Sequence, residues 1–145
     1  MLTKLNYNDC LDYSAIVMEL KAGTTIIYIE NFPLTEHKLI SFIDQLGSSI
    51  KEKRNNNEQS VFDVKISRQN DFFDSFANSN LKFPLHTDCA DFESVPNCIA
   101  LFCVEPAHEN QGANNFSFLQ KVLGDLAENR IQELLNKKWK FRKQW

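Results

Sequence analysis

The chain lacks the long hydrophobic runs that a membrane protein needs. None of its 145 residues lies in an apolar stretch long enough to span a bilayer, and residues 1–7 lack the apolar core of a secretory signal. An excess of positive charge is also missing, because 16 Lys and Arg stand against 19 Asp and Glu, a net charge of −3. The sequence therefore predicts a cytoplasmic protein that binds neither membrane nor nucleic acid.

The C-terminal segment and the cysteines each allow a second functional interpretation. Residues 137–145 are basic with interleaved aromatics, which permits a nucleic-acid or membrane interpretation, although lysines commonly gather at helix C-termini. The four cysteines lack the spacing of a disulfide scaffold, and buried free thiols are expected. A zinc site of Cys89, Cys98 and Cys103 with His86 is a weaker alternative, because the gaps do not fit paired Cys-x-x-Cys ligands.

The material for a folded domain is present, since 43% of the residues are hydrophobic and twelve are Phe. β-Branched and aromatic residues predict several strands, and apolar residues at helical spacing predict helices. One helix should begin after an N-cap at Thr35 and end at Gly47. The segment 97–104 is apolar on both faces, which is typical of a buried strand. The expected strands are 14–20, 24–29, 61–66, the stretch around 83–92, 97–104 and 115–118. The expected helices are 35–46, 119–126 and 131–135.

His86 and Asp88 are the candidate metal ligands of the sequence. Alternate side chains of a strand share one face, so the imidazole and the carboxylate should point the same way. One His and one carboxylate on a rigid surface form two thirds of the 2-His-1-carboxylate set that holds non-haem Fe(II). The alternative is an imidazole that is hydrogen-bonded to a nearby polar group.

The order of these features resembles the taurine dioxygenase (TauD/TfdA-like) family of Fe(II)- and 2-oxoglutarate-dependent oxygenases. The match extends over about residues 23–135. The segments that carry it are the helix end Asp44-Gln45-Leu46-Gly47, the motif Leu85-His86-Thr87-Asp88, Pro96 with the apolar segment 99–104, and Gln111-Gly112-Ala113-Asn114. The second is similar to the family's iron-binding His-Thr-Asp, and the last to its Gly-Gly-x-Thr segment.

The resemblance implies a fold, a chemistry and a set of ligands. The fold is α+β, a partial double-stranded β-helix (jelly roll) with flanking helices. It implies Fe(II) held by His86 and Asp88, and 2-oxoglutarate contacted by Asn114, which stands where the family has Thr. The implied reaction is the oxidative decarboxylation of 2-oxoglutarate to succinate by oxygen, coupled to oxidation of a C–H bond in a small-molecule substrate.

Two family residues have no counterpart in the sequence, the second iron-binding His and the Arg that binds 2-oxoglutarate. His108 precedes Asn114, and Arg130 and Arg142 match no family position. Residues 1–145 are therefore expected to form a single TauD/TfdA-like domain without the last barrel strands, one that binds Fe(II) weakly and is poorly active alone. His108 is interpreted as a solvated loop residue rather than as a substitute ligand.

A second, non-catalytic interpretation stays open. A jelly roll that lacks strands exposes sheet edges and apolar surface, and both favour association with other chains. The chain could then serve as a binding or dimerising module, a homo-oligomer joined through open sheet edges.

Overall fold

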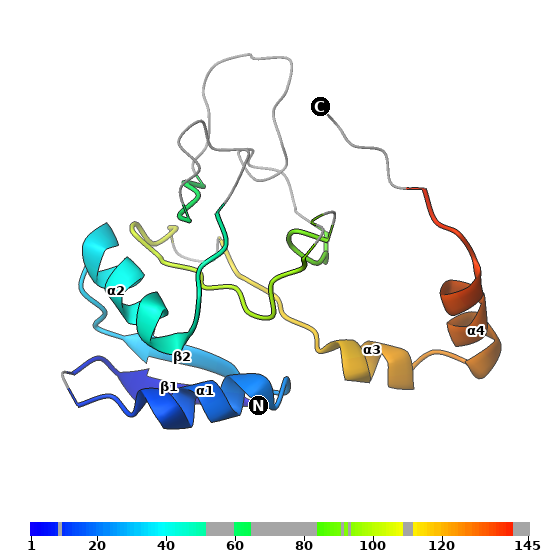
Figure 1. Ribbon diagram of the computed structural model, residues 1–145, viewed down its shortest axis with the longest axis horizontal. Coiled ribbons are helices and arrows are strands. Elements are labelled where there is room, and N and C mark those ends of the chain that lie inside the picture. Colours follow the sequence, from blue (N-terminus) through cyan, green and yellow to red (C-terminus); the bar gives the residue numbers. More distant parts are fainter. Residues whose placement is uncertain are drawn as a thin grey trace, which may run out of the picture.

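The computed structural model describes residues 1–8, 10–51, 60–64, 84–90, 92, 94–108 and 112–140. In chain order the elements are β1 (Leu2–Asn6), α1 (Tyr13–Lys21), β2 (Ile26–Glu30), α2 (Glu36–Leu46), α3 (Leu119–Gly124) and α4 (Glu128–Asn136). The fold class is therefore α+β. Figure 1 shows β1, α1, β2 and α2 gathered at one end of the molecule, with α4 at the other. Among the described residues no helix is long and apolar enough to cross a membrane.

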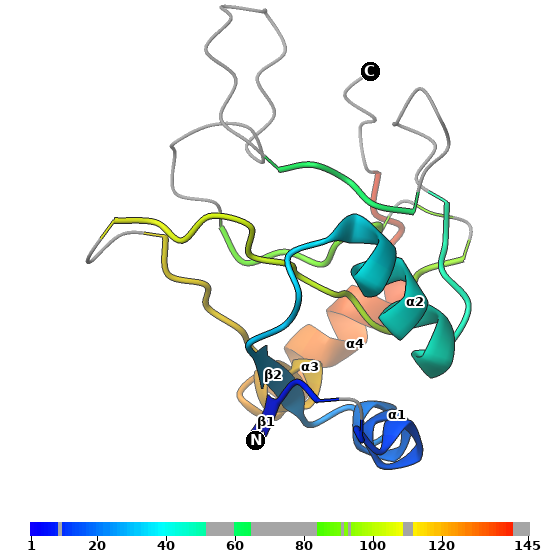
Figure 2. The same cartoon turned by 90° about the vertical axis from the view of Figure 1, so that its left-hand side faces the viewer.

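A parallel pair of strands organises the N-terminal unit. β1 and β2 are joined with Thr3 opposite Ile27 and Leu5 opposite Ile29. These side chains are partly buried on one face of the pair, while their neighbours along β1 are exposed. The Thr3 hydroxyl donates to the Glu19 carboxylate of α1 at 2.8 Å, so the covered face is the one toward α1 (Figure 2). The strand expected at 24–29 is confirmed as β2, whereas β1 was not predicted.

The strand expected at residues 14–20 is wrong, because this segment is α1. The Asp12 carboxylate accepts a hydrogen bond from the Ala15 backbone N–H at 3.0 Å, which starts the helix. The segment has the adjacent β-branched residues Ile16 and Val17. The Asp12 cap and the good helix formers at residues 18–21 favour a helix instead. Ile16 lies on the covered side of α1 and is only 4% exposed. Capping and burial together outweigh the β propensity of the segment.

Replacing Asp12 by Ala is expected to lower the free energy of unfolding by about 1 kcal/mol, because the Ala15 N–H loses its acceptor. Urea denaturation followed by circular dichroism measures the change. Thr35→Ala is the matched control, since the Thr35 side chain makes no capping bond to α2. An equal loss in the two variants would contradict a specific capping role for Asp12.

The helix predicted at residues 35–46 is confirmed as α2, with Gly47 at its end. Thr35 occupies the N-cap position, although its hydroxyl does not cap the helix as expected. Leu39 is the buried residue of this helix, at 9% exposed. The helices expected near the C-terminus are also confirmed, as α3 and α4, although Leu126 of the first stripe lies between them and not within α3.

Aromatic rings form the centre of the packing around α2. Phe32 lies with its ring centroid 4.8 Å from that of Tyr7, 5.3 Å from that of Phe42 and 5.8 Å from that of Phe102. Tyr13 extends the cluster, at 5.7 Å from Phe42. The cluster thus joins the end of β1, the two helices α1 and α2, and the distant segment 97–104.

The remaining expected strands are not present in the described residues. Residues 61–64, 97–104 and 115–118 form no strand, and residues 65 and 66 lie outside the described ranges. The segment 97–104 is not buried either, with Ile99 52%, Leu101 63% and Val104 70% exposed. A strand buried on both faces needs neighbouring strands, and β1 and β2 alone make up the sheet of the described part. The structure therefore does not show the jelly roll that the family implies.

Candidate metal centre

His86 and Asp88 lie in a loop and not in the strand that was predicted. Residues 84–87 are irregular, and a turn follows over residues 88–90. Cys89 takes a left-handed conformation with φ of +54°, and its carbonyl accepts from the Phe92 N–H at 3.0 Å. A strand needs a neighbouring strand for its backbone groups, and the described residues offer none here. The predicted strand is therefore wrong for the backbone of residues 84–90.

The imidazole of His86 lies between two oxygen atoms. Its Nε2 is 3.0 Å from Oδ1 of Asp88, and its Nδ1 is 2.9 Å from the carbonyl oxygen of Pro84. The side chains of His86 and Asp88 are 40% and 50% exposed, so ions in solution can reach them. The imidazole of His86 and the carboxylate of Asp88 therefore lie side by side, as expected for two residues that could bind one cation.

The spacing of this pair fits two neighbouring ligands of a cation. Ligand atoms about 2.1 Å from an octahedral cation and at right angles are about 3.0 Å apart. The Nε2 to Oδ1 distance is 3.0 Å. An imidazole nitrogen with a carboxylate oxygen is also the donor combination that non-haem Fe(II) uses. A hydrogen bond between His86 and Asp88 satisfies the same distance, so the alternative from the sequence agrees with the geometry too.

No third ligand joins the pair within the described ranges. No group of three or more His, Cys, Asp or Glu is close enough there to hold a metal ion. Neither His108 nor the cysteines complete such a group, so the zinc alternative finds no support. The prediction of buried thiols is wrong for Cys98 and Cys103, which are free but exposed, because segment 97–104 is not covered.

Asn114, the residue expected to contact 2-oxoglutarate, is exposed in the irregular stretch before α3. Two residues earlier, Gly112 has φ of +67°, and a Cβ there would lie 2.5 Å from the Cβ of Ala107. Glycine is therefore required at this position by both conformation and space. The geometry explains the glycine of the motif but leaves the role of Asn114 as a prediction.

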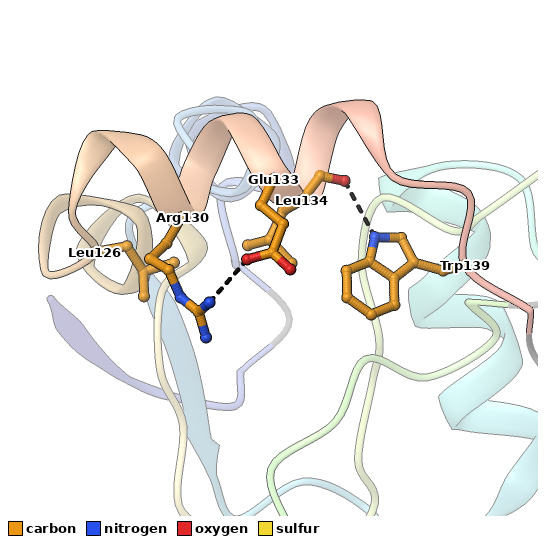
Figure 3. Close-up of a pocket in the computed structure, with 5 residues that line it drawn as sticks. All are labelled: Leu126, Arg130, Glu133, Leu134 and Trp139. Carbon is orange, nitrogen blue, oxygen red and sulfur yellow. Dashed lines mark hydrogen bonds and ion pairs between the residues drawn. The ribbon is translucent and has the colours of Figure 1, made fainter.

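A shallow hollow of about 230 Å³ lies beside α4 (Figure 3), and its lining includes neither His86 nor Asp88. Within it the Arg130 guanidinium donates to the Glu133 carboxylate at 2.7 Å, and the Trp139 indole N–H donates to the Leu134 carbonyl at 3.2 Å. Arg130 is thus paired within α4. The residues that line the hollow are Leu126, Arg130, Glu133, Leu134 and Trp139.

The contact that sequence reasoning missed is the one made by the backbone of Pro84. A carbonyl group has no sequence signature of its own, since every residue carries one.

Comparison with known proteins gives one finding. A family model described as "Taurine catabolism dioxygenase TauD, TfdA family" matches residues 3–145, a range that includes His86, Asp88 and Asn114. Curated proteins and solved structures give no significant match. Since the matched range covers nearly the whole chain, the protein belongs to the taurine catabolism dioxygenase TauD, TfdA family.

Proposed function

We propose that this chain is an Fe(II)- and 2-oxoglutarate-dependent dioxygenase-like protein that oxidises a C–H bond of a small molecule. The observation that carries the proposal is the 3.0 Å separation of His86 Nε2 and Asp88 Oδ1 in a member of this family. When bound, Fe(II) would supply oxygen activation with 2-oxoglutarate as the reductant. The proposal includes a cytoplasmic location and a single TauD/TfdA-like domain.

Each residue of the proposed site has a distinct task. His86 offers a nitrogen lone pair, and Asp88 offers a negative charge that offsets part of the charge of the cation. The side chains of both residues are partly exposed, so 2-oxoglutarate and substrate can approach the pair from solution. Asn114 can hydrogen-bond the co-substrate through its side-chain amide. The protein thus contributes binding and orientation, while the cofactor and co-substrate contribute the chemistry.

Metal binding is expected to be weak, because the described residues bring together one imidazole and one carboxylate. Isothermal titration of the chain with Mn(II), a stable substitute for Fe(II), should show low affinity. Tight, stoichiometric binding that survives His86→Ala would contradict both the ligand assignment and the expected weakness. His37→Ala is the control, since His37 is an exposed residue of α2.

A second candidate, a non-catalytic dimerising module, is favoured by exposed apolar side chains on the C-terminal helices. Leu119 of α3 is 66% exposed and Leu135 of α4 is 72% exposed. The two-stranded sheet of the described part also has open edges. An assay with Fe(II), 2-oxoglutarate and oxygen separates the candidates. Succinate supports the dioxygenase, whereas its absence together with a dimer in size-exclusion chromatography supports the module.

A further inference from the structure

We propose that α4 is the contact surface of a homodimer, in which α4 of a second copy of this chain lies antiparallel to it. The inference rests on the second candidate function, which it deepens, and it involves neither His86 nor Asp88. It starts from α4 itself, which has no buried residue although its apolar residues recur with helical spacing. A surface helix with this pattern normally covers its apolar side.

The apolar stripe of α4 consists of Ile131, Leu134 and Leu135, which share one side of the helix. Leu134 and Leu135 are 47% and 72% exposed, and Ile131 is only partly buried. In the described part of the chain α1 packs on β2 and on α2, whereas α4 lies at the opposite end of the molecule (Figure 1). The stripe is therefore accessible to another molecule.

The two ends of α4 carry opposite charges, and this decides which molecule fits. Asp125 and Glu128 lie at its beginning, and Lys137, Lys138 and Lys140 lie at its end, all of them exposed. A second α4 that runs antiparallel brings each acidic beginning next to a basic end, whereas a parallel one brings like charges together. Another copy of the same helix is thus a complementary partner in charge as well as in apolar surface.

One two-fold axis brings both kinds of contact into register. With the axis at the level of Glu133, Ile131 of one copy lies at the level of Leu135 of the other, and Glu128 lies at the level of Lys138. Each contact occurs twice, because the same surface serves both copies. Lys138 makes no ion pair with the part of the chain that the structure describes, so it is available to the second copy.

The contact surface is small, so the dimer is expected to be weak. α4 has nine residues, whereas stable interfaces bury about 800 Å² on each partner. We expect a dissociation constant of about 10–100 µM. Sedimentation equilibrium of the whole chain across that range measures it, because the average mass rises as the dimer forms.

The test reverses one charge at a time. Glu128→Lys sets two pairs of positive charges side by side in the dimer, and Lys138→Glu sets two pairs of negative ones. Each variant alone should dimerise about tenfold more weakly. An equimolar mixture of the two variants should regain the affinity of the unaltered chain, because every contact then joins opposite charges. Glu36→Lys is the matched control, since Glu36 is the acidic residue in the first turn of α2, as Glu128 is in α4. It should leave dimerisation unchanged.

Leu135→Ser tests the apolar part of the contact. Because Leu135 is 72% exposed, the variant should keep its helix content by circular dichroism while dimerisation falls at least tenfold. A dimer that ignores the charge reversals, or a mixture no stronger than the separate variants, would overturn this interface and leave the dimerising module. A monomer at every concentration would overturn both. The Mn(II) titration tests the dioxygenase separately, so its outcome does not depend on these results.

Discussion

Replacing Asp88 by Asn is expected to weaken Mn(II) binding by about 100-fold or more. Loss of groups that only orient metal ligands already costs about 10- to 100-fold, and Asp88 is proposed as a ligand itself. The substitution keeps the size of the side chain and removes its charge. The amide can still hydrogen-bond Nε2 of His86, which lies 3.0 Å from the present carboxylate oxygen. The loop should therefore keep its conformation while it loses the cation.

Electron paramagnetic resonance of free Mn(II) measures this affinity directly. Asp44→Asn removes the same charge from an exposed position on α2, so it controls for the change in net charge. His86→Ala should match Asp88→Asn, and the double variant should be little worse than either alone, because the two ligands act on one cation. Full additivity of the two losses would show that the residues do not share a metal ion.

Replacing Phe32 by Ala is expected to lower the free energy of unfolding by about 2–3 kcal/mol. Core Phe→Ala changes cost about 3–5 kcal/mol, and Phe32 is only partly buried, which places it below that range. Its ring contacts those of Tyr7, Phe42 and Phe102, and aromatic pairs contribute about 0.5–1.5 kcal/mol each beyond burial. Three contacts would be lost at once.

Urea denaturation of the variant, followed by circular dichroism, measures this loss. Phe116→Ala is the matched control, since Phe116 is 59% exposed and should cost well under 1 kcal/mol. A loss at Phe32 no larger than the loss at Phe116 would show that the aromatic cluster does not organise the N-terminal unit.

Local patterns in the sequence predicted the helices better than the strands. The apolar spacing of Leu39, Phe42 and Ile43 was enough for α2, because one covered face determines a helix. The segment 97–104 has a strong strand pattern but no partner strand in the described residues, and pairing depends on distant parts of the chain. The helix α1 was missed because the Asp12 cap outweighed a β-branched pair.

In the candidate site, too, the side-chain pattern was predictable and the backbone conformation was not. The short motif singled out His86 and Asp88 as candidate ligands, and the proximity of their side chains follows from a spacing of two residues. The turn at Cys89 could not be predicted, because a left-handed conformation is uncommon for residues with a Cβ. The Pro84 acceptor belongs to the backbone, which a reading of side-chain types does not reveal.

The contact between Phe102 and Phe32 also bears on how the molecule opens. It attaches segment 97–104, which follows the loop of His86 and Asp88, to the N-terminal unit, with ring centroids 5.8 Å apart. A ring pair of this kind is worth about 1 kcal/mol, which thermal fluctuations overcome often. Amide hydrogens of residues 97–104 should therefore exchange with deuterated water long before those of β1 and β2, so this segment detaches before the strand pair opens.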